Sequence, residues 1–401
     1  MVSQKRDAAI VGIYEYPLRK APGITPLQMK AECAAKALED AGLSWSDVDG
    51  LYDAQDGAGS AGLGLAEYFG FKPSVIDTTQ VGGSSYEFHA AHARRDIAAG
   101  KCKVALLTYG STAHSDMRRI GTGGGGGGGY SPGSSSPLSN MTDPWGVTLI
   151  SNYGMVASRH MFQYGTTSEQ LAAISVATRA HAMRNPEAVQ AMKDLEFVGV
   201  NEITVQDVLN SRMVADPLHL LECCMVSDGG GAVVIASPEV ARNCKKKPVW
   251  IIGSGEATKY SENGNDITVS AAAQSGPPAF AEAGITPAEI DIAMIYDSFT
   301  ITVLVMLEDL GFCKKGEGGP FVAGERLHFK SPLKPVINTD GGGLSSNHPG
   351  MRGIFLLLEA ARQLRGESTS QVDGAKLAVA HGNGGMLATS HTGGTIILAR
   401  D

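Results

Sequence analysis

One glycine-dense segment says most about the fold of this sequence, and it reads Asn338-Thr339-Asp340-Gly341-Gly342-Gly343-Leu344-Ser345-Ser346-Asn347-His348-Pro349-Gly350. Its glycines allow a backbone or a ligand to approach closely, and Pro349 fixes the geometry of the turn. The apolar pattern that follows predicts a helix from about Gly353 to Leu364. A histidine between a strand and a helix is suited to proton transfer or to holding an oxyanion. The turn alone is equally compatible with an exposed histidine that has no chemical role.

Composition bounds the class of protein. The chain has 401 residues, of which 18% are charged and 43% apolar, so it is long enough for two units that each bury a core. The net charge of -8 without a long basic run argues against nucleic-acid binding. The strongly apolar stretch from Ile301 to Leu307 is too short to span a bilayer, and Ala8 to Ile13 fits a first strand better than a signal peptide. Six cysteines without a Cys-x-x-Cys pair predict neither a disulfide framework nor a metal site. We therefore expect a soluble cytoplasmic protein.

Two echoes between distant parts of the chain predict a duplicated α/β architecture. The first joins residues 41–49, which read Ala-Gly-Leu-Ser and then Asp-Val-Asp, to residues 283–291, which read Ala-Gly-Ile-Thr and then Glu-Ile-Asp. The second joins residues 230–236 to residues 393–399, which share a Gly-Gly start and a β-branched run. Because the two echoes occur in the same order, we expect two related halves, 1–245 and 246–401, each with a sheet covered by helices.

Residues 111 to about 215 have no counterpart in the second half and are interpreted as an insertion. It opens with seven consecutive glycines, Gly123 to Gly129. No Gly-Lys-Ser/Thr follows them, so the run does not form a P-loop. A flexible surface excursion, a mobile cover over a bulky substrate and a docking segment all fit this composition.

The motifs as a set resemble those of thiolases. Asn338, Gly341 and Gly342, followed by Asn347-His348-Pro349-Gly350, match their late active-site signature. The segments Tyr296-Asp297-Ser298-Phe299-Thr300 and Ala215-Asp216-Pro217-Leu218 extend the resemblance to the branch of the sterol-carrier-protein-x thiolases and the steroid side-chain-cleaving aldolases. The resemblance covers nearly the whole chain and implies the five-layered αβαβα thiolase fold with duplicated halves, in which the insertion lies over the active site.

Both cysteines that a thiolase uses are missing. The nucleophile position, at the start of a helix predicted for residues 87–99, falls at Gly83 beside Ser84 and Ser85. A serine there would need a base to become a nucleophile, and helix capping is the alternative role. His381 takes the place of the second cysteine. It fits either a buried histidine at a strand end or a replacement proton carrier, since histidine titrates near neutral pH.

Tyr296 and Asp297 stand where thiolases carry an Asn-Glu-Ala-Phe motif. The resemblance to the aldolases implies that Tyr296 lies in the active site, whereas a tyrosine packed in the core is the structural alternative. Both residues fall within a strand predicted for Ile292 to Thr300, and adjacent strand residues face opposite sides. They can therefore both line a cavity only if the strand ends there. Near His348, the second catalytic tyrosine of the family is absent.

These features favour an aldolase over a thiolase. Retro-aldol cleavage of a β-hydroxyacyl-CoA needs a base for the hydroxyl proton and donors for the enolate, but no nucleophile. We expect Tyr296, His348, His381 and Asp297 to form the site, with coenzyme A present only as part of the substrate. A non-cysteine acyltransferase and a non-catalytic acyl-CoA-binding scaffold are the alternatives. The resemblance also implies a small OB-fold zinc-ribbon partner, and open sheet edges predict a homodimer.

Overall fold

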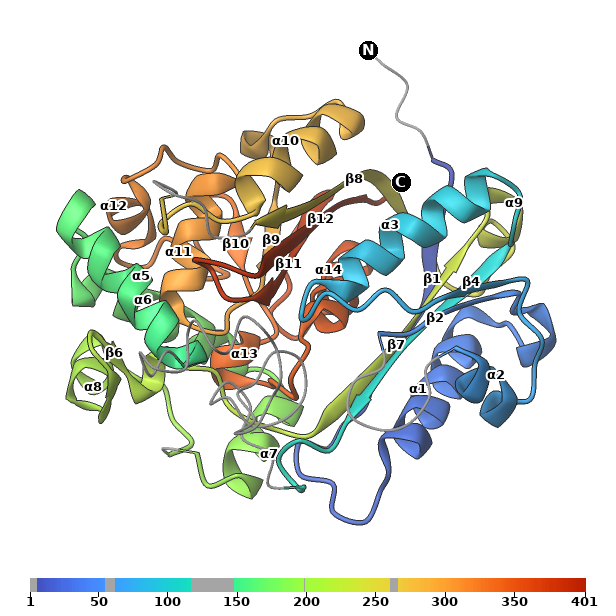
Figure 1. Cartoon of the computed structure of the whole chain (residues 1–401), viewed down its shortest axis with the longest axis horizontal. Helices are drawn as coiled ribbons and strands as arrows, with labels where there is room; N and C mark the ends of the chain where they lie inside the picture. Colours follow the sequence, from blue (N-terminus) through green and yellow to red (C-terminus); the bar gives the residue numbers. More distant parts are fainter. Residues whose placement is uncertain (1–5, 55–61, 117–147, 198, 260–265) are drawn as a thin grey trace.

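Figure 1 shows the computed structural model of the chain, which describes residues 6–54, 62–116, 148–197, 199–259 and 266–401. The seven-glycine run lies outside the described residues. No helix in these ranges is long and apolar enough to cross a membrane.

Ten strands form two sets of five with the same internal order. The first set runs β1-β7-β4-β2-β3 and the second β8-β12-β11-β9-β10. Numbered along the chain within each half, both orders are 1-5-4-2-3. The first-half strands are β1 (Ala9–Glu15), β2 (Gly50–Tyr52), β3 (Val75–Asp77), β4 (Val104–Ser111) and β7 (Gly229–Ala236). The second-half strands are β8 (Val249–Lys259), β9 (Ile292–Ile295), β10 (Val336–Ile337), β11 (Leu377–Gly385) and β12 (His391–Ala399). This shared topology confirms the duplication that the sequence echoes predict.

The two sets are joined at one edge. Ala9 pairs with Trp250 and Ile10 with Val249, so β1 and β8 link the halves into a single ten-stranded sheet. Elsewhere the two sets diverge and enclose two helices, α3 (Ser85–Ala98) and α14 (Gly353–Arg365). The predicted helix after the glycine-dense turn is thus confirmed, and it is one of this central pair.

Helices on both outer faces complete the five predicted layers. The helix α1 (Pro26–Ala41) packs on β1, β4 and β7, and α10 (Ala272–Ala283) packs on β8 and β12. Both α3 and α14 contact strands of the two halves. The α3 helix fits between two sheets because three of its alanines, Ala90, Ala91 and Ala93, are fully buried and demand little space. Local signals support α1: Thr25 and Gln28 form a capping box, and Gly42 ends the helix in the left-handed conformation.

The remaining helices lie around this core. The insertion between β4 and β7 folds into α5 (Leu149–Tyr164), α6 (Ser168–Ala182), α7 (Pro186–Asp194) and α8 (Val205–Asn210), with a small hairpin of β5 (Met213–Ala215) and β6 (Leu218–His219). The shorter helices are α2 (Leu63–Phe69), α9 (Pro238–Ala241), α12 (Gly318–Val322) and α13 (Gly342–Ser345). Figure 1 places α5 and α6 beside α11 (Thr300–Asp309), and both pack against it.

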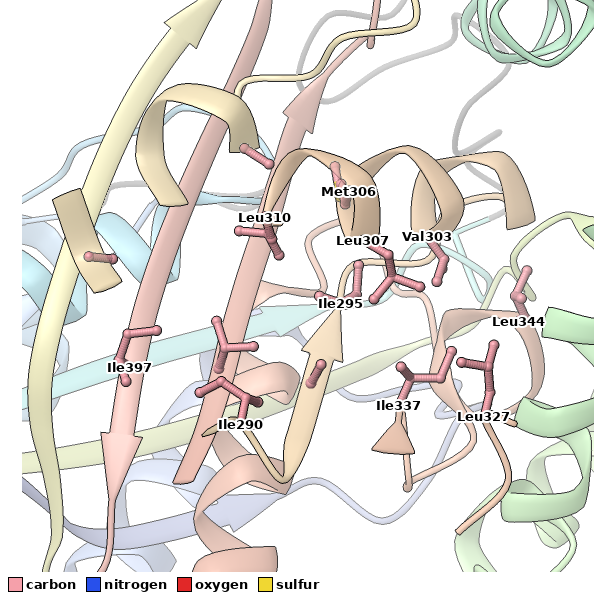
Figure 2. Close-up of a cluster of buried hydrophobic side chains, with 14 of the residues drawn as sticks. Ile290, Ile295, Val303, Met306, Leu307, Leu310, Leu327, Ile337, Leu344 and Ile397 are labelled. Carbon is pink, nitrogen blue, oxygen red and sulfur yellow. The ribbon is translucent and has the colours of Figure 1, made fainter. Parts of the chain in front are cut away.

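A buried apolar cluster connects α11 to the glycine-dense turn. Figure 2 shows Val303 and Leu307 of α11 beside Ile295 of β9, with Ile337 and Leu344 from the segment that leads to His348. Each of these side chains is at most 1% exposed. Burying a side chain of this size stabilises a fold by about 1.5–3 kcal/mol, so the cluster holds the turn firmly against the second-half sheet.

The strand predicted for Ile292 to Thr300 is too long. The strand β9 ends at Ile295, and α11 begins at Thr300. Asn338 explains the end of the strand, because its side chain both accepts from Ile295 N (2.8 Å) and donates to Ile295 O (2.9 Å). These two bonds occupy the backbone groups of the last strand residue and leave Tyr296 to start an irregular segment.

Candidate active site

A cavity of about 80 Å³ lies where the glycine-dense turn, α5 and the end of β11 meet. Its lining comes from five segments distant in sequence: Gly82 and Gly83; Leu149 and Tyr153; Tyr296 and Ser298; His348, Gly350 and Met351; Asn383 and Gly385. Two of the four predicted site residues, Tyr296 and His348, therefore face one cavity.

His348 presents a neutral imidazole to this cavity. Its backbone N–H donates to Ser227 Oγ (3.0 Å), which fixes the residue, while neither ring nitrogen has a partner among the described residues. Burial, assisted by the positive charge of Arg352, lowers the pKa of His348 to about 3. At neutral pH the ring thus carries one N–H donor and one acceptor, and neither is paired within the described residues.

The ring of Tyr296 meets that of His348 edge to face, with centroids 5.5 Å apart. The Tyr296 hydroxyl donates to Gly350 O (3.0 Å) and accepts from Arg352 N (3.2 Å). Burial raises the pKa of Tyr296 well above its ordinary value of 10.0. The phenol is thus protonated in the ligand-free site, and it also pins the turn that carries His348.

At Gly83 the site has no room for the cysteine side chain that a thiolase carries there. A Cβ atom at this position would lie 2.4 Å from Tyr296 Cε2, 2.6 Å from Tyr296 Cζ and 2.4 Å from the Asn383 carbonyl oxygen. Non-bonded carbon atoms do not approach so closely. The ring of Tyr296 therefore fills the space that a nucleophilic side chain at residue 83 would need.

A buried ionic network stabilises the turn that carries His348. Arg352 donates to the backbone oxygen of Asn347 (3.1 Å) and pairs with Asp340 and with Asp297 (Nε–Oδ1, 3.2 Å). Asn347 in turn donates to Glu15 (2.7 Å). Buried charges of this kind are costly to separate, so the network holds the backbone beside His348 in one arrangement.

Asp297 belongs to this network and does not line the cavity. Its carboxylate accepts from Gly343 N (2.7 Å) and Leu344 N (3.3 Å) and pairs with Arg352. Burial raises the pKa of Asp297 to about 6, against the opposing charge of Arg352. Although β9 ends before them, Tyr296 and Asp297 point to different surroundings: Tyr296 lines the cavity and Asp297 pairs with Arg352.

His381 is also outside the cavity lining. It sits on β11 opposite Thr395 of β12, and its Nδ1 lies 2.9 Å from Thr395 Oγ1. Its ring leans over Gly393, where a Cβ atom would lie 3.2 Å from His381 Cε1. Burial lowers the pKa of His381 to about 3. His381 O accepts from Tyr296 N (3.0 Å), but the His381 side chain does not line the cavity with Tyr296 and His348.

None of the six cysteines lines the cavity. Cys224 comes nearby, since its N–H donates to Ser298 O (2.9 Å), but burial raises its pKa above the ordinary value of 9.0. Ser84 and Ser85 do not line the cavity either. Ser84 Oγ contacts Thr392 Oγ1 (2.8 Å) and Ser85 Oγ donates to Gly82 O (2.6 Å). Ser84 stands at the start of α3 but makes no side-chain cap bond there, so its predicted capping role is wrong.

Sequence reasoning missed Tyr153 and Asn383. Asn383 Nδ2 donates to the Tyr153 hydroxyl (2.8 Å), which donates to Gly385 O (3.1 Å). The Tyr153 ring also packs on Phe299, with centroids 4.5 Å apart. Burial raises the pKa of Tyr153 to about 12. Asn383 lies two residues from His381 on β11, and this spacing was the one signal that pointed to it.

Comparison with known proteins agrees with this architecture. The family model "Thiolase C-terminal domain-like" matches residues 253–400. A "17-hydroxy-3-oxo-4-pregnene-20-carboxyl-CoA lyase" of Mycobacterium tuberculosis is 34% identical, over 92% of this chain and 94% of the relative. An "Acetyl-CoA acetyltransferase" of Methanothermobacter thermautotrophicus is 33% identical, over 97% of this chain and 98% of the relative. Among solved structures, the "Ltp2-ChsH2(DUF35) aldolase" superposes with a TM-score of 0.84 at 30% identity and covers 99% of both chains.

The duplicated five-layered fold and these relatives show that the chain belongs to the thiolase superfamily. Within that superfamily, its relatives include steroid side-chain-cleaving aldolases and the sterol carrier protein 2 group. The resemblance first seen in the sequence motifs is thereby confirmed.

Proposed function

We propose that this chain is an aldolase that cleaves the Cα–Cβ bond of a β-hydroxyacyl-CoA ester, of which a steroid side-chain CoA ester is the favoured example. The observation that carries the proposal is the pairing of Tyr296 with His348. The tyrosine ring occupies the space of a nucleophile at residue 83 and faces an imidazole whose ring nitrogens have no partner among the described residues. The printed names of two relatives, a steroid CoA lyase and a steroid side-chain-cleaving aldolase, support the substrate class.

Cleavage requires three movements of charge. A base takes the hydroxyl proton, the C–O bond becomes a carbonyl, and the electrons of the Cα–Cβ bond move into the thioester to give an enolate. The enolate then takes a proton at Cα, which releases a shorter acyl-CoA and a ketone or aldehyde. Negative charge develops on the thioester oxygen, so a fixed donor at that point lowers the barrier.

We propose that the thioester oxygen of the substrate binds to His348 and that its hydroxyl group lies against Tyr296. The neutral imidazole supplies an N–H donor without a protonation step, because its pKa of about 3 keeps it uncharged at neutral pH. Tyr296 accepts the hydroxyl proton in its ionised form. Since burial raises its pKa well above 10.0, that form is scarce at neutral pH and the reaction should accelerate with rising pH.

The test is a product survey by mass spectrometry. The chain is incubated with a panel of β-hydroxyacyl-CoA esters that includes steroid side-chain esters, with and without candidate partners. The expected result is one shorter acyl-CoA and one carbonyl compound in equal amounts. Absence of cleavage under every condition, together with binding of the esters, would favour a non-catalytic acyl-CoA-binding scaffold.

Acyl transfer without a cysteine is the second candidate, because a relative of almost full coverage is named an acetyltransferase. This function requires a covalent acyl group on the chain or direct transfer between two bound ligands. The intact mass of the protein after incubation with acetyl-CoA separates the first route from the aldolase. We expect no adduct, and a stable acyl group on Ser84, Ser85 or a cysteine would favour the transferase.

We also propose two kinds of assembly. The first is a homodimer, supported by the short edge strand β3, in which Ile76 is 44% exposed. The second is a complex with a small OB-fold zinc-ribbon protein, supported by the name of the superposed structure, which pairs an aldolase with a DUF35 protein. Light scattering of the chain, alone and mixed with candidate partners, tests both. A monomer at micromolar concentration in every mixture would contradict them.

A further inference from the structure

We propose that Asn383, oriented by Tyr153, selects ligands that present a hydrogen-bond donor to the cavity, and so favours β-hydroxyacyl over β-oxoacyl thioesters. Both residues line the same cavity as His348. This inference rests on the proposed function in that it takes the ligand to be an acyl-CoA ester. Asn383 acts here by positioning the ligand, because an amide oxygen does not remove a proton at neutral pH.

The orientation of the Asn383 amide follows from a chain of hydrogen bonds. Gly385 O, 3.1 Å from the Tyr153 hydroxyl, can only accept, so the single phenolic proton points to it. The Tyr153 oxygen then accepts from its remaining partners, which are Asn383 at 2.8 Å and the side chain of Ser298. Asn383 must therefore turn its NH₂ group toward Tyr153, and its Oδ1 faces away from it.

Asn383 Oδ1 is a buried acceptor with no partner among the described residues. A buried polar atom without a hydrogen bond is costly, and a ligand that supplies the missing donor recovers this cost. His348, which lines the same cavity, offers the complementary group, since one of its two unpartnered ring nitrogens carries a proton. The cavity thus combines an N–H donor with a carbonyl acceptor.

A β-hydroxyacyl thioester matches both groups. Its thioester oxygen accepts from His348. Its hydroxyl donates to Asn383 in the resting complex, in which Tyr296 is protonated, and passes the proton to Tyr296 only when that phenol is ionised. A β-oxoacyl thioester offers only acceptors along the same stretch, so its keto oxygen would face Asn383 Oδ1 with no proton between them. Sites built around a buried hydrogen-bonding group discriminate strongly against ligands that leave that group unpaired.

The experiment compares two uncleavable ligands by isothermal titration calorimetry. They are S-(3-hydroxybutyl)-coenzyme A and S-(3-oxobutyl)-coenzyme A, which lack the thioester carbonyl and differ only in the group that faces Asn383. Because the coenzyme A part is identical, its own amide donors cancel in the comparison. We expect the hydroxyl ligand to bind about tenfold more tightly, the ratio expected for one hydrogen bond gained and one acceptor left unpaired.

Three variants separate the parts of the argument. Asn383→Ala should bring the affinity ratio close to one. Tyr153→Phe keeps the ring against Phe299 but frees the amide to rotate, so the ratio should fall to about threefold or less. Tyr52→Phe is the matched control, since this buried tyrosine bonds Asp96 (2.9 Å) and does not line the cavity. It should keep the wild-type ratio.

Equal binding of the two ligands by the wild-type chain would overturn the inference. So would an Asn383→Ala variant that weakens both ligands by the same factor, which would assign Asn383 to the coenzyme A moiety. Failure of both ligands and of free coenzyme A to bind would overturn the proposed function and the inference with it. A tenfold preference for the hydroxyl ligand without cleavage of any ester would support the inference and contradict the proposed aldolase activity.

Discussion

Replacing Gly83 by alanine tests the central geometric claim, that Tyr296 occupies the space of a nucleophile. The added methyl group would meet Tyr296 Cε2 at 2.4 Å and the Asn383 carbonyl oxygen at 2.4 Å. Carbon atoms in contact prefer about 3.5–4.0 Å. Both the ring and the strand β11 must therefore move by about 1 Å to admit one methyl group.

The loss in the free energy of unfolding that this movement causes can be estimated. Forcing an extra methylene into a packed core destabilises a protein by about 1–3 kcal/mol, and one of the two obstacles here is backbone. Removing the ring of Tyr296 relieves only the contact with that ring and leaves the contact with the backbone oxygen of Asn383. We therefore expect Gly83→Ala to lower the free energy of unfolding by about 1–3 kcal/mol or more, and Tyr296→Ala in the same chain to recover only part of that difference.

Urea denaturation of the single and double variants measures both quantities. Gly50→Ala is the matched control, because its Cβ would also meet a tyrosine ring, at 3.1 Å from Tyr52 Cε2, and should cost less. Gly83→Cys should likewise form no acyl adduct with acetyl-CoA, as judged by intact mass. A Gly83→Ala variant as stable as the Gly50→Ala control would refute the packing argument, and an acylated Gly83→Cys would restore cysteine chemistry to the site.

Four further outcomes follow from the site. His348→Ala should lower kcat for ester cleavage by about 100-fold or more, because one oxyanion donor is lost, and should change the ligand Kd little. A variant that keeps wild-type turnover would place the oxyanion site elsewhere. Because burial raises the pKa of Tyr296 well above 10.0, its ionised fraction grows about tenfold per pH unit below that pKa. Wild-type kcat/KM should thus rise from pH 7 to 9, and the rise should vanish in Tyr296→Phe; a flat wild-type profile would exclude Tyr296 as the base. With its pKa lowered to about 3, His348 should add no acid limb between pH 5 and 8. Asp297→Asn should weaken the pairing with buried Arg352 and lower the free energy of unfolding by up to about 3–5 kcal/mol, with turnover per folded molecule retained; lost turnover at unchanged stability would make Asp297 catalytic.

The sequence by itself determined the features that are local or repeated. The echoes at residues 41–49 and 283–291 lie in corresponding places of two halves with the same strand order. The helix after the glycine-dense turn begins at Gly353, as its apolar pattern requires. The absence of a cysteine at Gly83 was also visible, because the motif around it fixes its position along the chain. Such features can be predicted from the sequence alone, since each depends on residues that are neighbours along the chain.

Only the tertiary structure decided which polar side chains share the cavity. Tyr296 and Asp297 are adjacent, yet β9 ends at Ile295 and the two point into different surroundings. His381 and Asn383 share one face of β11, but His381 lies opposite Thr395, which bonds it, and Asn383 lies opposite Gly393, which has no side chain. Tyr153 reaches Asn383 across 230 positions of sequence. A side chain's direction depends on where its strand ends and what packs beside it, and these are set by contacts between segments far apart in the chain.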